Sequence, residues 1–245
     1  MAMKSLLLDS VQSVFQRLGL RVAFDHPVRN APKLFARKVA DYGVKTVLDI
    51  GANKGQFGVL LRAEGYRGRL ISFEPLSAAH AMLSRAAASD PHWTVAPAMA
   101  LGDRDDSAEI NVAKNLASSS FLPVLERSVS AADASAYMAT ETVKVRRLDG
   151  VVDAAWEAPF AVKLDTQGFE LHVLRGGLQT LARTNVILTE MSLAPLYEGG
   201  TAFVELYRFL EEAGFRCVTL TQVFSDNRSH ELLQVDGVFV RKSPE

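Results

Sequence analysis

The stretch VLDIGANKGQFG, residues 47–58, is the segment of the sequence that most clearly indicates the fold. Its first four residues are apolar apart from Asp49, which is typical of a buried strand, and Gly51 and Gly55 bracket a tight turn before the start of a helix. A strand, a turn with few side chains and an exposed helix N-terminus are expected to point backbone N–H groups at a ligand. The turn therefore predicts a nucleotide-like ligand without naming it.

Strand-like and helix-like segments alternate from Lys45 onward. We expect strands near 45–50, 69–74, 93–98, 108–113, 142–147, 160–165, 185–190, 215–221 and 235–241, and helices near 55–64, 77–88, 168–182 and 202–213. This order predicts an α/β fold with a doubly wound, mostly parallel sheet. The last two strands have no helix between them and are expected to form a C-terminal antiparallel hairpin. Ligands then belong at the carboxyl ends of the parallel strands.

The chain has 245 residues, 48% of them hydrophobic, which is enough for one full core. We predict a single domain over 45–245 and an N-terminal helical extension over 1–44. Apolar residues at helical spacing in that extension predict an amphipathic helix that packs on the domain or forms a homo-oligomer contact; they are Leu7, Val11, Val14, Phe15 and Leu18. Residues 108–147 contain a Ser- and Ala-rich tract, which predicts an insertion or flap over the ligand-binding face.

Charge and cysteine content limit the partners. A formal net charge of -1 and a pI near 6.5 argue against nucleic acid. No apolar run approaches the roughly 20 residues that a membrane span needs. The single cysteine, Cys217, excludes an internal disulfide and suits a reducing compartment. We therefore expect a cytoplasmic protein that acts on a small molecule.

Glycine spacing separates the candidate nucleotides. Lys54 precedes Gly55, which is incompatible with a Walker phosphate loop, and the glycines do not fit G-x-G-x-x-G. The short-chain dehydrogenase pattern G-x-x-x-G-x-G needs a glycine where Phe57 stands, and its Tyr-x-x-x-Lys pair is absent at all five tyrosines. An NAD(P)-dependent reductase is therefore a disfavoured alternative.

S-adenosylmethionine fits the turn better, because it carries no phosphate and needs close backbone approach with an acid near its cationic groups. Asp49 and Gly51 offer both, and Asn53 and Gly55 belong to the same candidate cofactor-binding turn. The strand LISFE ends in Glu74, 19 residues after Gly55, where a carboxylate can accept hydrogen bonds from both ribose hydroxyls.

The adenine end of the cofactor is assigned to the tract AMALGD, residues 98–103. The backbone near Ala100 and Leu101 is expected to flank the adenine, with Asp103 near its amino group. The alternative is that this tract is a simple turn.

The most distinctive segment is FAVKLDTQGFELHVLRGG, residues 160–177. With DIGANKG, SFEP and RRLDG it resembles the FkbM family of S-adenosylmethionine-dependent methyltransferases, over about residues 46–240. The resemblance implies a seven-stranded, Rossmann-like class I methyltransferase fold and methyl transfer to a hydroxyl of a sugar or secondary metabolite. His172 departs from the family pattern and is expected to face solvent. A non-catalytic S-adenosylmethionine-binding module is the remaining alternative.

Three residues are candidates for the chemistry. Asp165 ends its strand beside the cofactor turn, so it is a candidate general base or metal ligand; the alternative is a helix cap. Glu190 ends the neighbouring strand, and the two carboxylates would suit Mg²⁺; the alternative is that Glu190 bonds to backbone or pairs with Lys163. His230, in the loop between the last two strands, is a second candidate base, and Tyr197 is a candidate for the acceptor pocket.

Overall fold

The computed structural model describes residues 27–242, so the amphipathic helix predicted near the N-terminus lies outside the described residues. The strands are β1 (Thr46–Ile50), β2 (Arg69–Phe73), β3 (Trp93–Val95), β4 (Ala100–Gly102), β5 (Asp106–Ala113), β6 (Tyr137–Arg147), β7 (Phe160–Leu164), β8 (Thr184–Ser192), β9 (Phe215–Ser225) and β10 (Leu232–Arg241). The helices are η1 (Pro27–Arg29), α2 (Ala31–Asp41), α3 (Gln56–Ala63), α4 (Ser77–Ala87), α5 (Glu126–Ala131), η2 (Asp133–Ser135), α6 (Leu148–Val151), α7 (Glu170–Arg175), α8 (Leu178–Ala182) and α9 (Phe203–Glu212).

Seven strands form the main sheet, in the order β3-β2-β1-β7-β8-β10-β9. The first five are parallel, and β10 runs antiparallel to both β8 and β9. The order reverses at β1, so the carboxyl ends of β1 and β7 lie side by side at the switch point where open α/β sheets bind ligands. The predicted fold class and its C-terminal hairpin are confirmed.

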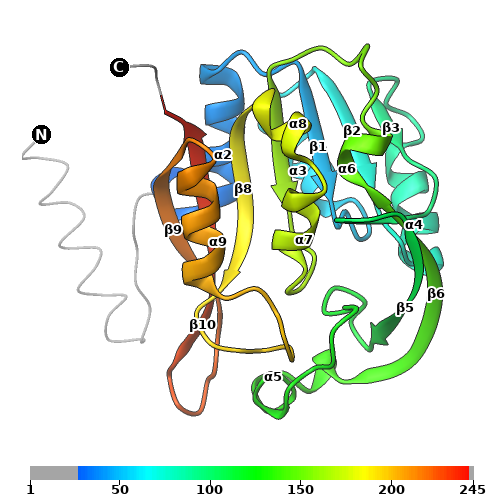
Figure 1. Cartoon of the computed structure of the whole chain (residues 1–245), viewed down its shortest axis with the longest axis vertical. Helices are drawn as coiled ribbons and strands as arrows, with labels where there is room; N and C mark the ends of the chain where they lie inside the picture. Colours follow the sequence, from blue (N-terminus) through cyan, green and yellow to red (C-terminus); the bar gives the residue numbers. More distant parts are fainter. Residues whose placement is uncertain (1–26, 243–245) are drawn as a thin grey trace, which may run out of the picture.

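Helices cover both faces of this sheet (Figure 1). Buried residues of α2, α3 and α4 share one core cluster with β1, and buried residues of α6, α7, α8 and α9 share another. Strands β1 and β7 are buried at every position, which is the expected consequence of being covered twice. The core thus fixes the strand ends that carry the polar residues.

A second, three-stranded sheet has the order β4-β6-β5, and the segment expected to be a flap, residues 108–147, supplies β6 and most of β5. The strand predicted at 93–98 is shorter in the structure, as β3, and residues 100–102, expected to flank the adenine or to form a simple turn, are β4 of this second sheet. In Figure 1 the small sheet and α5 lie beyond the carboxyl ends of β7 and β8. The loop between β5 and β6 is therefore on the same side of the molecule as those strand ends.

The predicted helix over 168–182 is interrupted, and close packing explains the break. Helices α7 and α8 are separated by Gly176 and Gly177. A Cβ at position 176 would lie 1.9 Å from the carbonyl oxygen of Gly102 in β4. Glycine is required there because the two backbones touch, and it holds the small sheet against the main domain.

Helix α2 falls within the predicted extension and packs on the main sheet. Asn30 caps its first turn by accepting a hydrogen bond from the Lys33 N–H at 3.0 Å. Five of its eleven residues are buried, and Phe35 is fully inaccessible in the cluster that also contains Val47 and Leu188. Among the described residues, no helix is long and apolar enough to cross a membrane.

Truncation of Phe35 tests whether α2 belongs to the core. We expect Phe35→Ala to lower the free energy of unfolding by about 3–5 kcal/mol, because it leaves a cavity against the sheet. Urea unfolding checks this, with Arg37→Ala on the exposed side of the same helix as the matched control. Equal stability of the two variants would contradict the packing described for α2.

Candidate functional site

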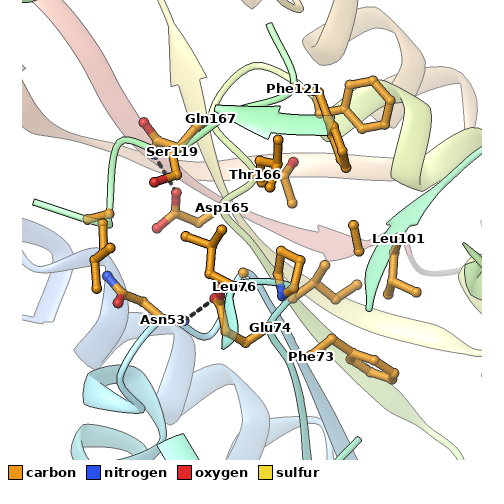
Figure 2. A pocket seen from close by; sticks show the side chains of 18 of the residues that line it. Asn53, Phe73, Glu74, Leu76, Leu101, Ser119, Phe121, Asp165, Thr166 and Gln167 are labelled. Atoms are coloured by element: carbon orange, nitrogen blue, oxygen red, sulfur yellow. Dashed lines mark hydrogen bonds between the residues drawn. The ribbon is translucent and has the colours of Figure 1, made fainter. Parts of the chain in front are cut away.

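A pocket with about 650 Å³ of empty space opens at the carboxyl ends of β1, β2 and β7 (Figure 2). Its wall is completed by β4 and by residues 116–121 of the loop after β5. Five of the sequence-predicted site residues line it: Gly51, Asn53, Glu74, Ala100 and Asp165. The remaining five, Asp49, Gly55, Asp103, Glu190 and His230, are not among its lining residues.

The turn after β1 satisfies its own backbone donors. Gly51 and Ala52 donate to the Phe73 carbonyl at 3.1 and 3.0 Å, and Gly55 donates to Ala52 at 2.9 Å. The N–H of Asn53 donates to Glu74 and that of Lys54 to the side chain of Gln56. The expectation that these amides point at the ligand is therefore wrong for residues 51–55. A turn with no spare donors is unsuited to clamping a phosphate.

A glycine is required at position 51 both by the backbone conformation of this residue and by the close approach of another backbone segment. Its φ is +74°, and a Cβ there would lie 1.9 Å from the carbonyl oxygen of Asp165. The turns after β1 and β7 therefore touch through their backbones. Gly55 (φ +90°) instead packs against Leu83 and Trp93, so its role is in the fold of the turn.

Glu74 is fixed by two backbone donors. Its Oε2 accepts from the Asn53 N–H at 2.8 Å and its Oε1 from the Leu76 N–H at 2.9 Å. Burial raises the pKa of this carboxyl group, and the two backbone bonds oppose that rise. Each oxygen keeps a further lone pair for a hydroxyl donor in the pocket. Nearby, the buried Oδ1 of Asn53 has no hydrogen-bond partner among the described residues.

Lys163 lies beneath the turn and is almost completely buried. Its Nζ donates to the Gly51 carbonyl at 2.6 Å and forms ion pairs with Asp49 at 3.5 Å and Asp165 at 3.6 Å. Burial lowers the pKa of Lys163, but the carboxylates of Asp165 and Asp49 outweigh it and the pKa is raised overall. The ion pairs of Lys163 are therefore with Asp49 and Asp165 and not with Glu190, the partner considered from the sequence.

Asp49 and Asp103 occupy positions that sequence reasoning did not anticipate. Asp49 is fully buried, accepts from the Ser72 hydroxyl at 3.0 Å and reaches the pocket only through Lys163. Asp103 accepts from Nδ1 of His172 at 2.8 Å, and both line a neighbouring cavity. His172 was expected to face solvent, but its ring stacks on Phe169 with centroids 4.2 Å apart.

The carboxylates of Asp165 and Glu190 are bridged by an amide. Nε2 of Gln167 donates to Oδ1 of Asp165 at 2.7 Å and to Oε2 of Glu190 at 2.8 Å, and Gln234 donates to the same Glu190 oxygen at 2.8 Å. No group of three His, Cys, Asp or Glu among the described residues could hold a metal ion. A donor between the two carboxylates does not fit the predicted Mg²⁺ site.

The two acids next to this bridge, Glu190 and Asp236, have raised pKa values. Burial raises the pKa of Glu190 well above its usual range, and the negative charge of Asp165 raises it further. Burial and the same charge raise the pKa of Asp236, which pairs with Glu190 across β10 and β8, to about 7. Asp165 itself faces the pocket, with 39% of its side chain exposed.

His230 lies in the exposed loop between β9 and β10. That loop is tied to α5 by an ion pair of Glu231 with Arg127 at 3.4 Å. The pocket at the strand ends does not include His230 in its lining, so the structure brings Asp165 to the cofactor face and leaves His230 apart.

Two residues at the site, Gln167 and Glu170, were given no role from the sequence. Gln167 lines the pocket and bridges two carboxylates. Glu170 is buried and its Oε1 accepts from the backbone of Thr166 at 2.9 Å and Gly168 at 3.2 Å, which folds the turn after β7. The sequence signal for Gln167 was the polar run directly after a buried strand, ending in Gly168, and Glu170 lies two residues beyond that glycine.

Comparison with protein families gives a match over residues 49–217 to the methyltransferase FkbM domain. With the sheet order and the pocket at its switch point, this defines an S-adenosylmethionine-dependent methyltransferase. The chain belongs to the FkbM methyltransferase family. The match decides against the reductase alternative. The comparison with curated proteins finds no match.

Solved structures share the fold at low sequence identity. A proposed tRNA (m1A22) methyltransferase from Streptococcus pneumoniae, solved with S-adenosyl-L-methionine, aligns with a TM-score of 0.52 and 11% identity over 89% of this chain and 75% of its own. A proposed O-methyltransferase from Klebsiella pneumoniae aligns at 0.48 with 14% identity over 96% and 90%. The 1,6-didemethyltoxoflavin-N1-methyltransferase from Burkholderia thailandensis aligns at 0.48 with 12% identity over 99% and 90%.

The raised pKa of Asp236 predicts a pH-dependent stability. Because the folded state keeps a proton that the unfolded state releases near pH 4, stability falls as pH rises through about 7. Asp236→Asn removes this loss. The difference in the free energy of unfolding between the variant and the unsubstituted protein should therefore shift in favour of the variant by about 2 kcal/mol between pH 5 and pH 8. Urea unfolding at both pH values measures the difference. Glu109→Gln, at an exposed position, is the control, and parallel pH profiles for Asp236→Asn and the unsubstituted protein would contradict the expectation.

Proposed function

We propose that this protein transfers the methyl group of S-adenosylmethionine to a hydroxyl oxygen of a small carbohydrate or natural-product acceptor, with Asp165 as the general base. The observation that carries the proposal is the position of one partly exposed carboxylate, Asp165, in the wall of the pocket beside the turn of Gly51. The catalytic roles of Glu190 and His230 are not part of it.

The residues present fit the cofactor. The turn after β1 has no spare amide for a phosphate, whereas its Gly51 carbonyl and the unpartnered Oδ1 of Asn53 are acceptors suited to a ligand with cationic and N–H groups. Glu74 would hold the ribose hydroxyls, and Ala100 and Leu101 line the wall expected to flank the adenine. When bound, the cofactor supplies an electrophilic methyl group.

The protein's own task is then to align the acceptor and take its proton. Asp165 is hydrogen-bonded on Oδ1 and faces Lys163 with Oδ2, so the carboxylate has a fixed direction and free lone pairs. Alignment of this kind supplies most of the rate in bimolecular transfers, with effective molarities of about 10⁵ M or more. No step is assigned to a metal, because the amide between Asp165 and Glu190 does not fit one.

A small acceptor is favoured by the walls and by charge. Residues 116–121 of the loop after β5 contribute apolar side chains, including Leu116 and Phe121, to the pocket. The Asp165 carboxylate lines the pocket, and a net charge of -1 provides no excess of basic residues with which to bind a polyanion. We therefore favour a neutral hydroxylated molecule over a nucleic acid.

The cofactor is tested first by calorimetric titration with S-adenosylhomocysteine and, separately, NADH. We expect micromolar binding of the first alone. Glu74→Ala should weaken it about tenfold or more, about 1.4 kcal/mol, because hydrogen bonds to the ribose are lost. Glu64→Ala, at an exposed position at the end of α3, is the matched control and should change nothing. Unchanged affinity in Glu74→Ala would refute the ribose placement.

The base is tested by Asp165→Asn in a screen of hydroxylated acceptors for methyl transfer. We expect the rate to fall by about 10²- to 10⁴-fold while binding of S-adenosylhomocysteine is retained, because proton removal is lost and cofactor contacts are not. Full activity of Asp165→Asn would remove Asp165 from the chemistry. Binding without transfer to any acceptor class would instead favour the non-catalytic module.

A further inference from the structure

We propose that Gln167 is a positioning residue of the methyl-transfer site: its side-chain amide, oriented by the Tyr197 hydroxyl, fixes the Asp165 carboxylate in its direction toward the pocket. This inference rests on the proposed role of Asp165. It assigns a function to two residues, Gln167 and Tyr197, that lie outside the proposed set of catalytic and cofactor-binding groups.

Three bonds determine the orientation of the Gln167 amide. Its Nε2 donates to Oδ1 of Asp165 at 2.7 Å and to Glu190 at 2.8 Å, and its Oε1 accepts from the Tyr197 hydroxyl at 2.7 Å. Both N–H groups of the Gln167 amide therefore donate to carboxyl groups. A rotated amide would turn its oxygen toward a carboxylate, so the Tyr197 hydroxyl sets which side faces Asp165. Figure 2 shows the bond from Gln167 to Asp165 at the pocket wall.

The backbone of Gln167 is held in place at a conformational cost. Its φ is +54°, in the left-handed region that residues with a Cβ rarely adopt. The Ser120 hydroxyl donates to the Gln167 carbonyl at 2.7 Å, and Glu170 accepts from the amide of the following Gly168. Because such strained residues persist only where surrounding contacts impose them, this geometry points to a constraint on the Gln167 side chain.

Charge explains why a donor is needed at this point. The titratable groups that interact with Asp165 come from every element around it; they are Asp49 on β1, Lys163 on β7, Glu170 on α7, Glu190 on β8, Tyr197 before α9 and Asp236 on β10. Four of these six are acids, and Lys163 is the single cation among them. An amide that donates to both Asp165 and Glu190 holds the Asp165 carboxylate in place, which an apolar side chain would not do.

The test compares the affinity for S-adenosylmethionine, which carries a sulfonium charge, with that for uncharged S-adenosylhomocysteine. The ratio of the two dissociation constants reports the charge and placement of Asp165 and needs no acceptor. We expect Gln167→Met, which keeps the length and removes the donors, to lower the preference for S-adenosylmethionine about tenfold, because the Asp165 carboxylate is no longer held toward the sulfonium.

Three further variants make the outcome specific. Tyr197→Phe should reproduce the loss of preference in part, because it removes only the group that orients the amide. In an Asp165→Asn background, Gln167→Met should have no further effect on the preference. Gln179→Met, at an exposed position of α8, is the matched control and should behave as the unsubstituted protein.

The two ways of failing are distinguishable. If Asp165→Asn alone leaves the preference unchanged, Asp165 is not beside the methyl group, and both the proposed function and this inference fail. If Asp165→Asn lowers the preference but Gln167→Met has no effect on it, or weakens binding of both ligands equally, Gln167 only fills space and the inference alone is overturned.

Discussion

The buried ammonium group of Lys163 is the contact on which the geometry of the site depends. It binds the carbonyl of Gly51, lies between the carboxylates of Asp49 and Asp165, and so joins the ends of the two central strands. A lone charge in the core would be costly, and the two acids offset that cost. The charged Lys163 holds the Gly51 carbonyl of the cofactor turn in place. The packing of the core and the geometry of the pocket therefore depend on the same residue.

Much of this arrangement could be predicted from the sequence, because it depends on order and period. Buried strands followed by polar residues place Gly51, Glu74 and Asp165 at one edge of a parallel sheet, and all three line the pocket. Gly51 is identified by its motif and Glu74 by its spacing from it. The antiparallel hairpin follows from the missing helix between the last two strands.

Side-chain partnerships could not be predicted, because they join segments that only the folded chain brings together. Asp103 bonds to His172, 69 positions away, and Gln167 to Tyr197, 30 positions away. Asp49 reads as a ligand-facing acid in the sequence and is in fact fully buried against Ser72. His230 follows the correct strand but lies in an exposed loop apart from the pocket, and loop paths leave little trace in a sequence pattern.

The placement of β10 between β8 and β9 affects how much of the chain a stable domain needs. The family match ends at residue 217, within β9, and begins after α2, yet β10 separates β8 from β9 and α2 covers one face of the sheet. A fragment cut at the limits of the match would leave β8 with an open edge and apolar side chains uncovered, which favours strand pairing between copies. The segment that identifies the family is shorter than the segment that can fold.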